Sequence, residues 1–191
     1  LGLKTAIVEK ESLGGICLNW GCIPTKALLK SAQVFEYLKN ANDYGINVEN
    51  VDKDFNSVIS RSRKVADTMS KGVKFLMKKN KITVFNGFGK LSEKNIVSVV
   101  NDKNEEKKLR GENIVIATGA RSRDLTNIKQ DGKHVIGYRE AMTLKKQPKN
   151  IVIIGSGAIG IEFAFFYNSM GSEVTVIEYQ NRIIPNEDKD I

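Results

Sequence analysis

The chain has 191 residues, of which 41% are hydrophobic and 7% aromatic, as is ordinary for a globular protein. No apolar run approaches the ~20 residues of a membrane-spanning helix, so we expect no membrane association. A formal net charge of +8 can indicate a nucleic-acid partner. Here the lysines are scattered over predicted helices and loops without interleaved aromatic residues, so we expect a solvated basic surface and no nucleic-acid partner.

The first nine residues contain a glycine, a short apolar strand and a terminal acid, Glu9. Residues 170–178 repeat this order and end in Glu178. The later copy follows a predicted strand, a glycine turn and a helix, which is the order typical of a dinucleotide-binding unit. We therefore expect the first residues to be the second half of another such unit. Its first strand and glycine turn would precede residue 1, and the chain would be cut at both ends.

Both cysteines of the chain, Cys17 and Cys22, lie close together in the sequence. Pro24 is a residue favoured in the first turn of a helix, so a helix is expected to begin near Cys22. The positive end of that helix would favour the thiolate of Cys22, and Lys26 supplies a nearby cation. The pattern indicates a redox-active dithiol.

Three other interpretations of the dithiol stay open: a structural disulfide, a zinc site and a pair of inert buried thiols. No signal peptide and no further cysteine pair favours the structural disulfide. A zinc site needs about four ligands, and the only histidine of the chain is His134. Because His134 lies in a polar segment, we expect it at the surface, and we expect no metal site.

Between the two similar units, the apolar pattern predicts helices at 24–41 and 55–79. The second helix carries an apolar stripe that is expected to face the core: Val58, Val65, Met69, Val73, Leu76 and Met77. Strands are predicted at 82–85, 96–100 and 114–117, with a polar hairpin turn at 101–106. After the last strand, the segment 118–120 is expected to approach a bound nucleotide through its backbone.

A strand, a glycine turn and a helix are predicted near the C-terminus, at 151–154, 155–160 and 161–167. A second strand at 173–177 leads to Glu178, 23 positions after Gly155, close to the ~20 positions typical of dinucleotide-binding units. The alternative is a strand–helix–strand unit whose glycines merely allow tight packing.

Each glycine of this turn has its own role in a dinucleotide-binding unit. Gly155 would permit the tight turn, Gly157 the approach of the pyrophosphate, and Gly160 the close packing of helix and strand. A carboxylate at Glu178 would accept bonds from the ribose of NAD and repel the extra phosphate of NADP. Arg182, four residues later, weakens that preference.

Residues 14–26, 114–120 and 155–178 together resemble the flavin disulfide reductases, and within them the group of dihydrolipoamide dehydrogenases. The string from Cys17 to Leu29 is specific to this group, whereas glutathione and mercuric reductases tend to have valine in place of Leu18. The resemblance implies an α/β fold with two Rossmann-like FAD/NAD(P)-binding domains, both incomplete here. Residues 1–149 would form the FAD-binding domain, without its first strand and glycine turn. Residues 150–191 would begin the NAD-binding domain, and the C-terminal dimerisation domain would be absent.

The resemblance also implies roles for individual residues. Those implied to bind FAD are Glu9, Gly14, Gly15, Cys17, Lys26, Gly89, Thr118, Gly119 and Ala120. Those implied to bind NAD are Gly155, Ser156, Gly157, Ala158, Ile159, Gly160, Glu162 and Glu178. Of the catalytic residues, Cys22 would face the flavin, Cys17 would exchange with the substrate, and Lys26 would pair with Glu162. The alternative for Glu162 is an ordinary, partly exposed helix carboxylate.

The activity implied is oxidation of protein-bound dihydrolipoyl groups with NAD+ through the cysteine disulfide and FAD. The implied partners are the lipoyl domains of 2-oxoacid dehydrogenase complexes and a second copy of the full-length protein, in the cytoplasm. The family's catalytic histidine and glutamate would lie outside this chain, so the chain alone is expected to bind FAD poorly and to be inactive. The alternatives are a glutathione-like or mercuric reductase, and a nucleotide-binding redox module without turnover.

Overall fold

The computed structural model describes residues 2–190, which form two compact units of mixed α/β structure. Unit 1 comprises Leu1–Gly21 and Ala66–Arg123, and unit 2 comprises Cys22–Val65 and Asp124–Ile191. The chain therefore passes from unit 1 to unit 2 between the two cysteines. No helix within residues 2–190 is long and apolar enough to cross a membrane.

Unit 1 contains two small sheets. Strand β1 (Ala6–Glu9) pairs in parallel with β2 (Thr83–Asn86), and helix α1 (Gly15–Trp20) follows β1 along the chain. Strands β3 (Phe88–Glu93), β4 (Ile96–Val100) and β5 (Glu106–Arg110) form an antiparallel sheet in that order. Gly87 links the sheets with φ at +148°, where a Cβ would lie 2.5 Å from the carbonyl oxygen of Val100. Only glycine fits this connection.

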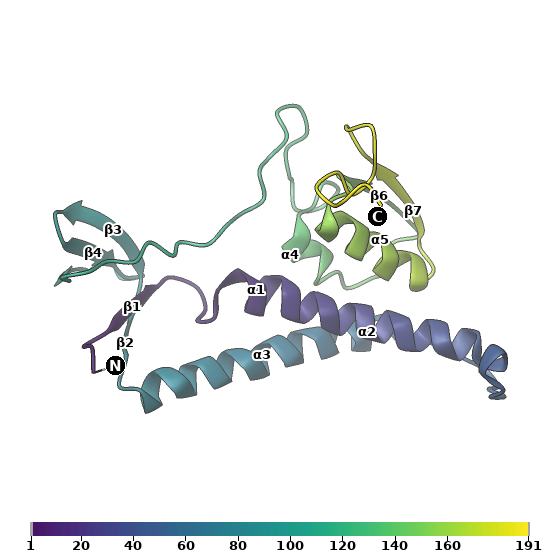
Figure 1. Cartoon of the computed structure of the whole chain (residues 1–191), viewed down its shortest axis with the longest axis horizontal. Coiled ribbons are helices and arrows are strands. Elements are labelled where there is room, and N and C mark those ends of the chain that lie inside the picture. Colours follow the sequence, from purple (N-terminus) through teal and green to yellow (C-terminus); the bar gives the residue numbers. More distant parts are fainter. Residues whose placement is uncertain (1, 191) are drawn as a thin grey trace. The chain divides into compact units, whose positions relative to one another are not determined.

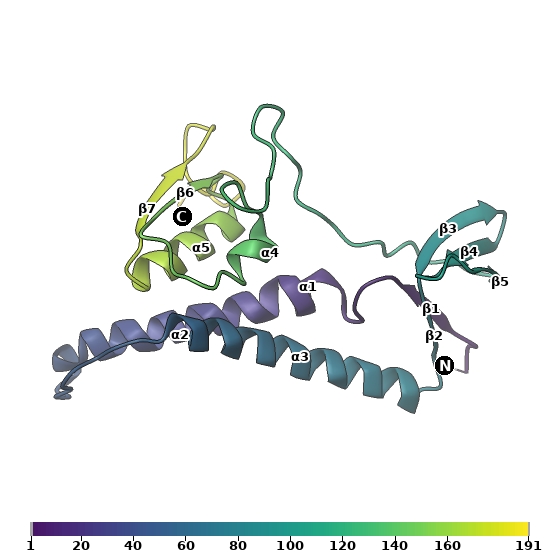
Figure 2. The same cartoon turned by 180° about the vertical axis from the view of Figure 1, so that it is seen from behind.

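Unit 2 combines helices with a parallel pair of strands. Helix α2 (Cys22–Lys39) is followed by the 3-10 helix η1 (Ala41–Tyr44) and by the first part of helix α3 (Phe55–Lys79). After the short helix α4 (Tyr138–Ala141), strand β6 (Asn150–Ile154) pairs in register with β7 (Glu173–Ile177). Helix α5 (Ala158–Ser169) connects these strands and packs against both of them and against α2 (Figures 1 and 2).

The main core lies in unit 2. Its buried members are Leu28, Ala32, Phe55, Ile59, Ala141, Met142, Phe163, Phe166, Tyr167 and Met170. Tyr167 is fully buried, and its hydroxyl donates a hydrogen bond to the carbonyl oxygen of Ala141 at 2.6 Å. Burial raises the pKa of the Tyr167 phenol, which therefore stays a neutral donor. This contact holds α5, which carries the glycine turn at its start, against α4.

Most elements of the sequence analysis are confirmed. The predicted helix at 55–79 matches α3, the predicted strand at 173–177 matches β7, and α2 begins two residues before the predicted start. The polar turn is also present: the Asn101 side chain accepts the backbone N–H groups of Lys103 and Glu105, each at 3.0 Å. Strands β3 and β5 were not predicted, because charged and glycine-containing strands lack the apolar alternation that marks a strand.

Two predictions about structure are wrong. Residues 114–117 form no strand, and Val115 and Ile116 are 87% and 70% exposed. Within residues 2–190, none of the sheets includes this segment, so its backbone makes no ladder hydrogen bonds there. The apolar stripe of α3 is not wholly buried either, since Met69 and Leu76 are 46% and 47% exposed.

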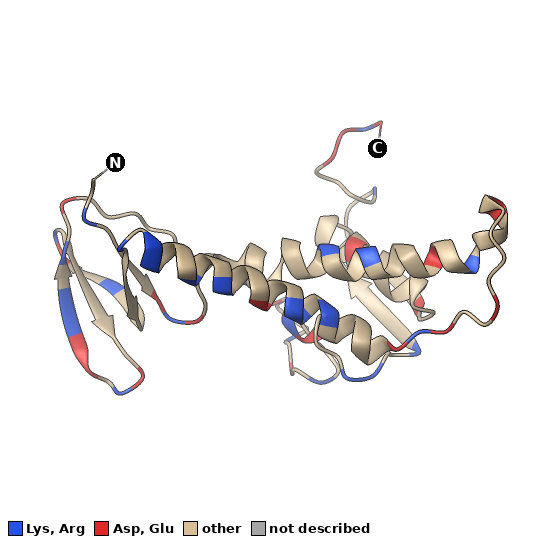
Figure 3. Cartoon of the chain, turned by 90° about the horizontal axis from the view of Figure 1, so that it is seen from below, with Lys and Arg blue, Asp and Glu red and all other residues tan. Residues whose placement is uncertain are grey.

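The buried line of α3 instead includes small and polar side chains. It contains Phe55, Ile59, Ser62, Ala66 and Ser70, spaced three or four residues apart. Lys and Arg residues are spread along the rest of this helix and also lie on β3 and β5 (Figure 3). The basic charge of the chain is thus distributed over several elements, as expected from the sequence.

Candidate redox and nucleotide-binding site

The two cysteines are joined in a disulfide. Cys17 lies in α1, and Cys22 is the first residue of α2, so the predicted helix start is confirmed. Gly21 separates the two helices; a Cβ there would lie 3.1 Å from the Cα of Cys17 and 3.2 Å from the carbonyl oxygen of Ile16. The bond contradicts the inert-thiol and zinc interpretations, which need unbonded sulfur.

A buried amide supports the loop before Cys17. The Asn19 side chain, 7% exposed, donates hydrogen bonds to the carbonyl oxygens of Leu13 at 3.0 Å and Gly15 at 2.9 Å. Gly14 and Gly15 have φ values of +100° and +69° in this loop, as glycine readily allows. Asn19 is not among the residues predicted from the sequence; its signal there is a polar residue within an otherwise apolar short helix.

Lys26 and Glu162 form an ion pair, as the resemblance implied. Lys26 lies about one helical turn after Cys22 on α2, and Glu162 lies on α5. The pair therefore connects the disulfide-bearing helix of unit 2 to the helix that follows the glycine turn. Lys26 and Glu162 are 63% and 29% exposed, so we expect the pair to add only ~0–1 kcal/mol to stability. The pair is therefore of interest because it connects α2 to α5, and its contribution to the free energy of unfolding is small.

The glycine turn between β6 and α5 contains one glycine required by packing. A Cβ on Gly160 would lie 2.0 Å from the carbonyl oxygen of Gly155, so α5 crosses the turn at a distance that only glycine permits. Gly155 has φ at +100°, and its N–H donates to the carbonyl oxygen of Ile177 at 2.8 Å. The turn is thereby tied to the end of β7.

Packing does not explain Gly157, which caps the start of α5. No described atom lies within 4 Å of a Cβ built there, and its φ of −65° suits any residue. The backbone N–H groups at the start of α5 and the positive end of its dipole fit a phosphate group. Open space beside Gly157 is what the approach of a pyrophosphate requires. The packing-only alternative therefore accounts for Gly160 but not for Gly157.

Glu178 is bound to the same turn. Its carboxylate accepts the backbone N–H of Gln180 at 2.8 Å, and the backbone N–H and hydroxyl of Ser156 at 2.8 and 2.7 Å. These donors, first that of Gln180 and then those of Ser156, lower the pKa of Glu178 to about 2. Glu178 is therefore an ionised acceptor at the end of β7, the position from which an acid reaches an adenine ribose.

Glu9 occupies the corresponding position at the end of β1 and accepts the N–H of Glu11 at 2.7 Å. Each acid thus accepts the N–H two residues further on, and the sequence repeat is also a structural one.

Gly89, on β3, was implied by the resemblance to bind FAD. Packing also accounts for a glycine at this position, since a Cβ there would lie 3.1 Å from the side chain of Val8. Thr118, Gly119 and Ala120 lie in an exposed segment without regular structure, where Gly119 has φ at +75°.

His134 lies at the surface, as predicted, and its side chain is 77% exposed. It follows Asp131, whose carboxylate accepts the N–H groups of Lys133, His134 and Val135. These donors lower the pKa of Asp131 to about 2. Within residues 2–190, no group of three or more His, Cys, Asp or Glu side chains could hold a metal ion.

The sequence of this chain is similar to those of known dihydrolipoyl dehydrogenases. Dihydrolipoyl dehydrogenase of Zymomonas mobilis is 48% identical over 191 residues, covering 100% of this chain and 41% of that protein. Dihydrolipoyl dehydrogenase of Bacillus subtilis is 44% identical over 199 residues, covering 100% of this chain and 42% of that protein. The chain thus spans about two fifths of the length of the curated relatives it matches.

Two solved structures have the same fold. The crystal structure of LpdA from Mycobacterium tuberculosis matches 98% of this chain and 41% of its own, with a TM-score of 0.89 and 22% identity. The Cu(II) complex of a cysteine-to-serine mutant of RclA, an HOCl-induced flavoprotein disulfide reductase from Escherichia coli, matches with a TM-score of 0.84 and 27% identity. It covers 100% of this chain and 40% of the RclA chain. The sequence pattern of one family matches residues 1–191, and the chain therefore belongs to the pyridine nucleotide-disulphide oxidoreductases.

Proposed function

We propose that the protein to which this chain belongs is an FAD-dependent dihydrolipoamide dehydrogenase that uses NAD+. The observation that carries the proposal is the Lys26–Glu162 pair, which connects the helix that begins at Cys22 to the helix that begins at the glycine turn. Cys22, one half of the disulfide, and the glycine turn thereby lie on adjacent helices of unit 2. The high identity to dihydrolipoyl dehydrogenases favours this substrate over glutathione or mercuric ion.

The residues present fit both cofactors. Gly157 leaves the backbone at the start of α5 open, and ionised Glu178 can accept hydroxyl hydrogen bonds from a ribose. For FAD we propose Glu9, the Gly14–Gly15 loop and residues 118–120 as contacts, with Lys26 beside the flavin. We also propose that residues 1–149 belong to the FAD-binding domain and 150–191 to the NAD-binding domain. Bound FAD would carry two electrons from the cysteines to the nicotinamide.

Disulfide exchange would begin at Cys17. A thiolate of the substrate dithiol attacks the Cys17 sulfur, breaks its bond to Cys22 and releases Cys22 as a thiolate. The second thiol of the substrate, after losing its proton, attacks the substrate sulfur joined to Cys17. This closes the substrate disulfide and leaves Cys17 reduced. Two electrons have then passed from the substrate dithiol to the cysteine pair.

The surroundings of Cys22 would stabilise its thiolate. Cys22 is the first residue of α2, where the backbone N–H groups and helix dipole favour negative charge. The ammonium of Lys26 lies one turn further along and is itself paired with Glu162. For the base that deprotonates the substrate, we propose the histidine and glutamate of the family, outside residues 1–191. We further propose lipoyl domains of 2-oxoacid dehydrogenase complexes as substrates, a homodimer, and a cytoplasmic location.

The test is an anaerobic titration of the full-length, flavin-loaded protein with dihydrolipoamide. We expect long-wavelength charge-transfer absorbance after two-electron reduction, and NADH formation once NAD+ is added. Cys17→Ser should keep the charge-transfer band and lose turnover, whereas Cys22→Ser should lose both. The matched cysteine variants separate the two roles. Absence of the band and of NADH would overturn the proposal, and a preference for NADPH would favour the related reductases.

A further inference from the structure

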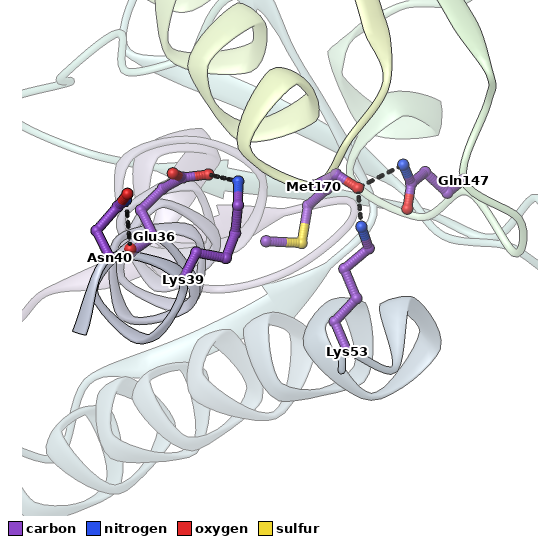
Figure 4. Close-up of polar contacts among 6 residues, drawn as sticks. All are labelled: Glu36, Lys39, Asn40, Lys53, Gln147 and Met170. Atoms are coloured by element: carbon purple, nitrogen blue, oxygen red, sulfur yellow. Dashed lines mark hydrogen bonds and ion pairs between the residues drawn. The ribbon is translucent and has the colours of Figure 1, made fainter. Parts of the chain in front are cut away.

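The carbonyl oxygen of Met170, just past the end of α5, accepts hydrogen bonds from two side chains. One donor is the Lys53 ammonium, and the other is the Gln147 amide at 2.6 Å (Figure 4). The last carbonyl groups of a helix lack partners within the helix. Met170 is itself 1% exposed, so its carbonyl depends on donors that reach it from the protein. Two segments distant in the sequence therefore meet at the end of α5.

Lys53 also contacts α2. Its ammonium lies 5.0 Å from the centre of the Phe35 ring, in cation–π geometry. Lys53 precedes α3, so one ammonium joins the start of α3 to α2 and to the end of α5. All of these residues belong to unit 2. The positive charge of Lys53 at the C-terminal end of α5 also interacts favourably with the negative end of the helix dipole.

The surrounding backbone is shaped to admit this ammonium. Gly171 has φ at +88°, and a Cβ there would lie 3.2 Å from the Lys53 nitrogen. Gln147 donates a second bond to the Ser172 hydroxyl at 3.3 Å, and Ser172 donates to the carbonyl oxygen of Pro148 at 2.7 Å. The end of α5 is thereby fixed to the segments that lead into β6 and β7.

The opposite end of α5 is the glycine turn, and Glu162 lies between the two ends. A helix is stiff, so whatever fixes its last carbonyl also limits how its first turn can move. We propose that Lys53 is a positioning residue, whose ammonium holds the end of α5 and thereby sets the placement of the dinucleotide turn. The proposal rests on the proposed function only in taking the ligand of that turn to be NAD(H).

The experiment compares three variants of the full-length, flavin-loaded protein. Lys53→Met removes the ammonium and keeps the side-chain length, Lys53→Arg restores a cation, and Lys39→Met is the matched control. The Lys39 ammonium lies 5.4 Å from the same Phe35 ring but is bonded to Glu36 at 2.8 Å on its own helix. In Figure 4, Lys39 is joined to Glu36 and Lys53 to Met170. The control therefore removes an equivalent charge without touching α5.

For Lys53→Met we expect the dissociation constant of NADH and the KM for NAD+ to rise about two- to five-fold, the range of a lost charge–dipole contact. The KM for dihydrolipoamide and the oxidised flavin spectrum should stay unchanged. Lys53→Arg should recover most of the NADH affinity, and Lys39→Met should match the wild type. A merely structural role would lower the thermal midpoint without this selective change in nucleotide affinity.

Unchanged NADH affinity in Lys53→Met overturns the proposal, as does an equal loss in Lys39→Met. If Lys53→Met does not fold, Lys53→Ala removes both the charge and the N–H donor with a smaller side chain, and unchanged NADH affinity in that variant is equally decisive. Direct NADH binding also separates the two proposals. A wild-type protein that binds NADH but does not oxidise dihydrolipoamide overturns the proposed function alone, and one that binds no NADH overturns both.

Discussion

Gly160 and Gly155 approach so closely that a Cβ on Gly160 would lie 2.0 Å from the carbonyl oxygen of Gly155. Beside them, Gly157 faces open space. Glycines of one short turn are thus required for different reasons. Gly160 is required by the protein's own backbone, and Gly157 fits the approach of an external group. The distinction can be tested one residue at a time.

Gly160→Ala should destabilise the protein, because its Cβ meets a backbone atom that cannot rotate away. We expect a loss of ~1–3 kcal/mol, as for overpacking, measured by denaturant unfolding. Gly157→Ala should keep the wild-type unfolding midpoint, since its backbone conformation suits alanine, but should weaken NADH binding. Unchanged NADH binding in Gly157→Ala would contradict the proposed phosphate contact, and destabilisation equal to that of Gly160→Ala would contradict the open space at Gly157.

Glu178 should show a pH dependence set by its lowered pKa. Its pKa is lowered from 4.5 to about 2 by the donors of Gln180 and Ser156. A lowered pKa means that the ionised form is favoured in the folded protein, so its stabilising contribution is complete above pH 4.5 and is lost as the pH falls toward 2.

The measurement for Glu178 is the unfolding midpoint of wild type and Glu178→Gln across this pH window. We expect the difference between them to be largest near neutral pH and to shrink on acidification. Glu49→Gln, which changes an exposed carboxylate, serves as the control and should show no such trend. A constant difference at all pH values would contradict the assignment.

Asn19 should be important for stability near the disulfide. Asn19→Leu removes both donors of a buried amide and leaves the carbonyl oxygens of Leu13 and Gly15 without them. We expect a loss of ~1–3 kcal/mol and faster reduction of the disulfide by an external thiol. Asn40→Ala is the control, because its amide bonds a backbone carbonyl at an exposed position. It should cost less than ~0.5 kcal/mol.

The coupling energy between Lys26 and Glu162 should be small for the free energy of unfolding and larger for the rate of catalysis. A double-mutant cycle of Lys26→Met and Glu162→Gln should give ~0–1 kcal/mol of coupling in unfolding, because Lys26 is 63% exposed. In full-length protein, we expect each variant to slow reduction by dihydrolipoamide, with a non-additive double variant. Additive effects on reduction would show that the two residues act independently.

The sequence by itself determined the local elements and the chemistry they carry. Helical and strand periodicity located α3 and β7, and the positions of Cys22 and Pro24 predicted the start of α2. The spacing of the glycines and of the following acid indicated the dinucleotide turn. Helices, strands and turns of this kind depend on residues close together in the sequence, so a sequence pattern can reveal them. The two acids at strand ends, Glu9 and Glu178, were likewise visible as a repeat.

Only the tertiary structure decided which distant groups meet. Residues 114–117 have an apolar strand pattern yet form no ladder, because a strand needs a partner that periodicity does not supply. Met69 fits the apolar stripe of α3, but the buried line includes Ser62 and Ser70 instead. The contact of Lys53 with the carbonyl of Met170 joins residues far apart in the sequence. Such contacts depend on packing in three dimensions, and no local pattern encodes them.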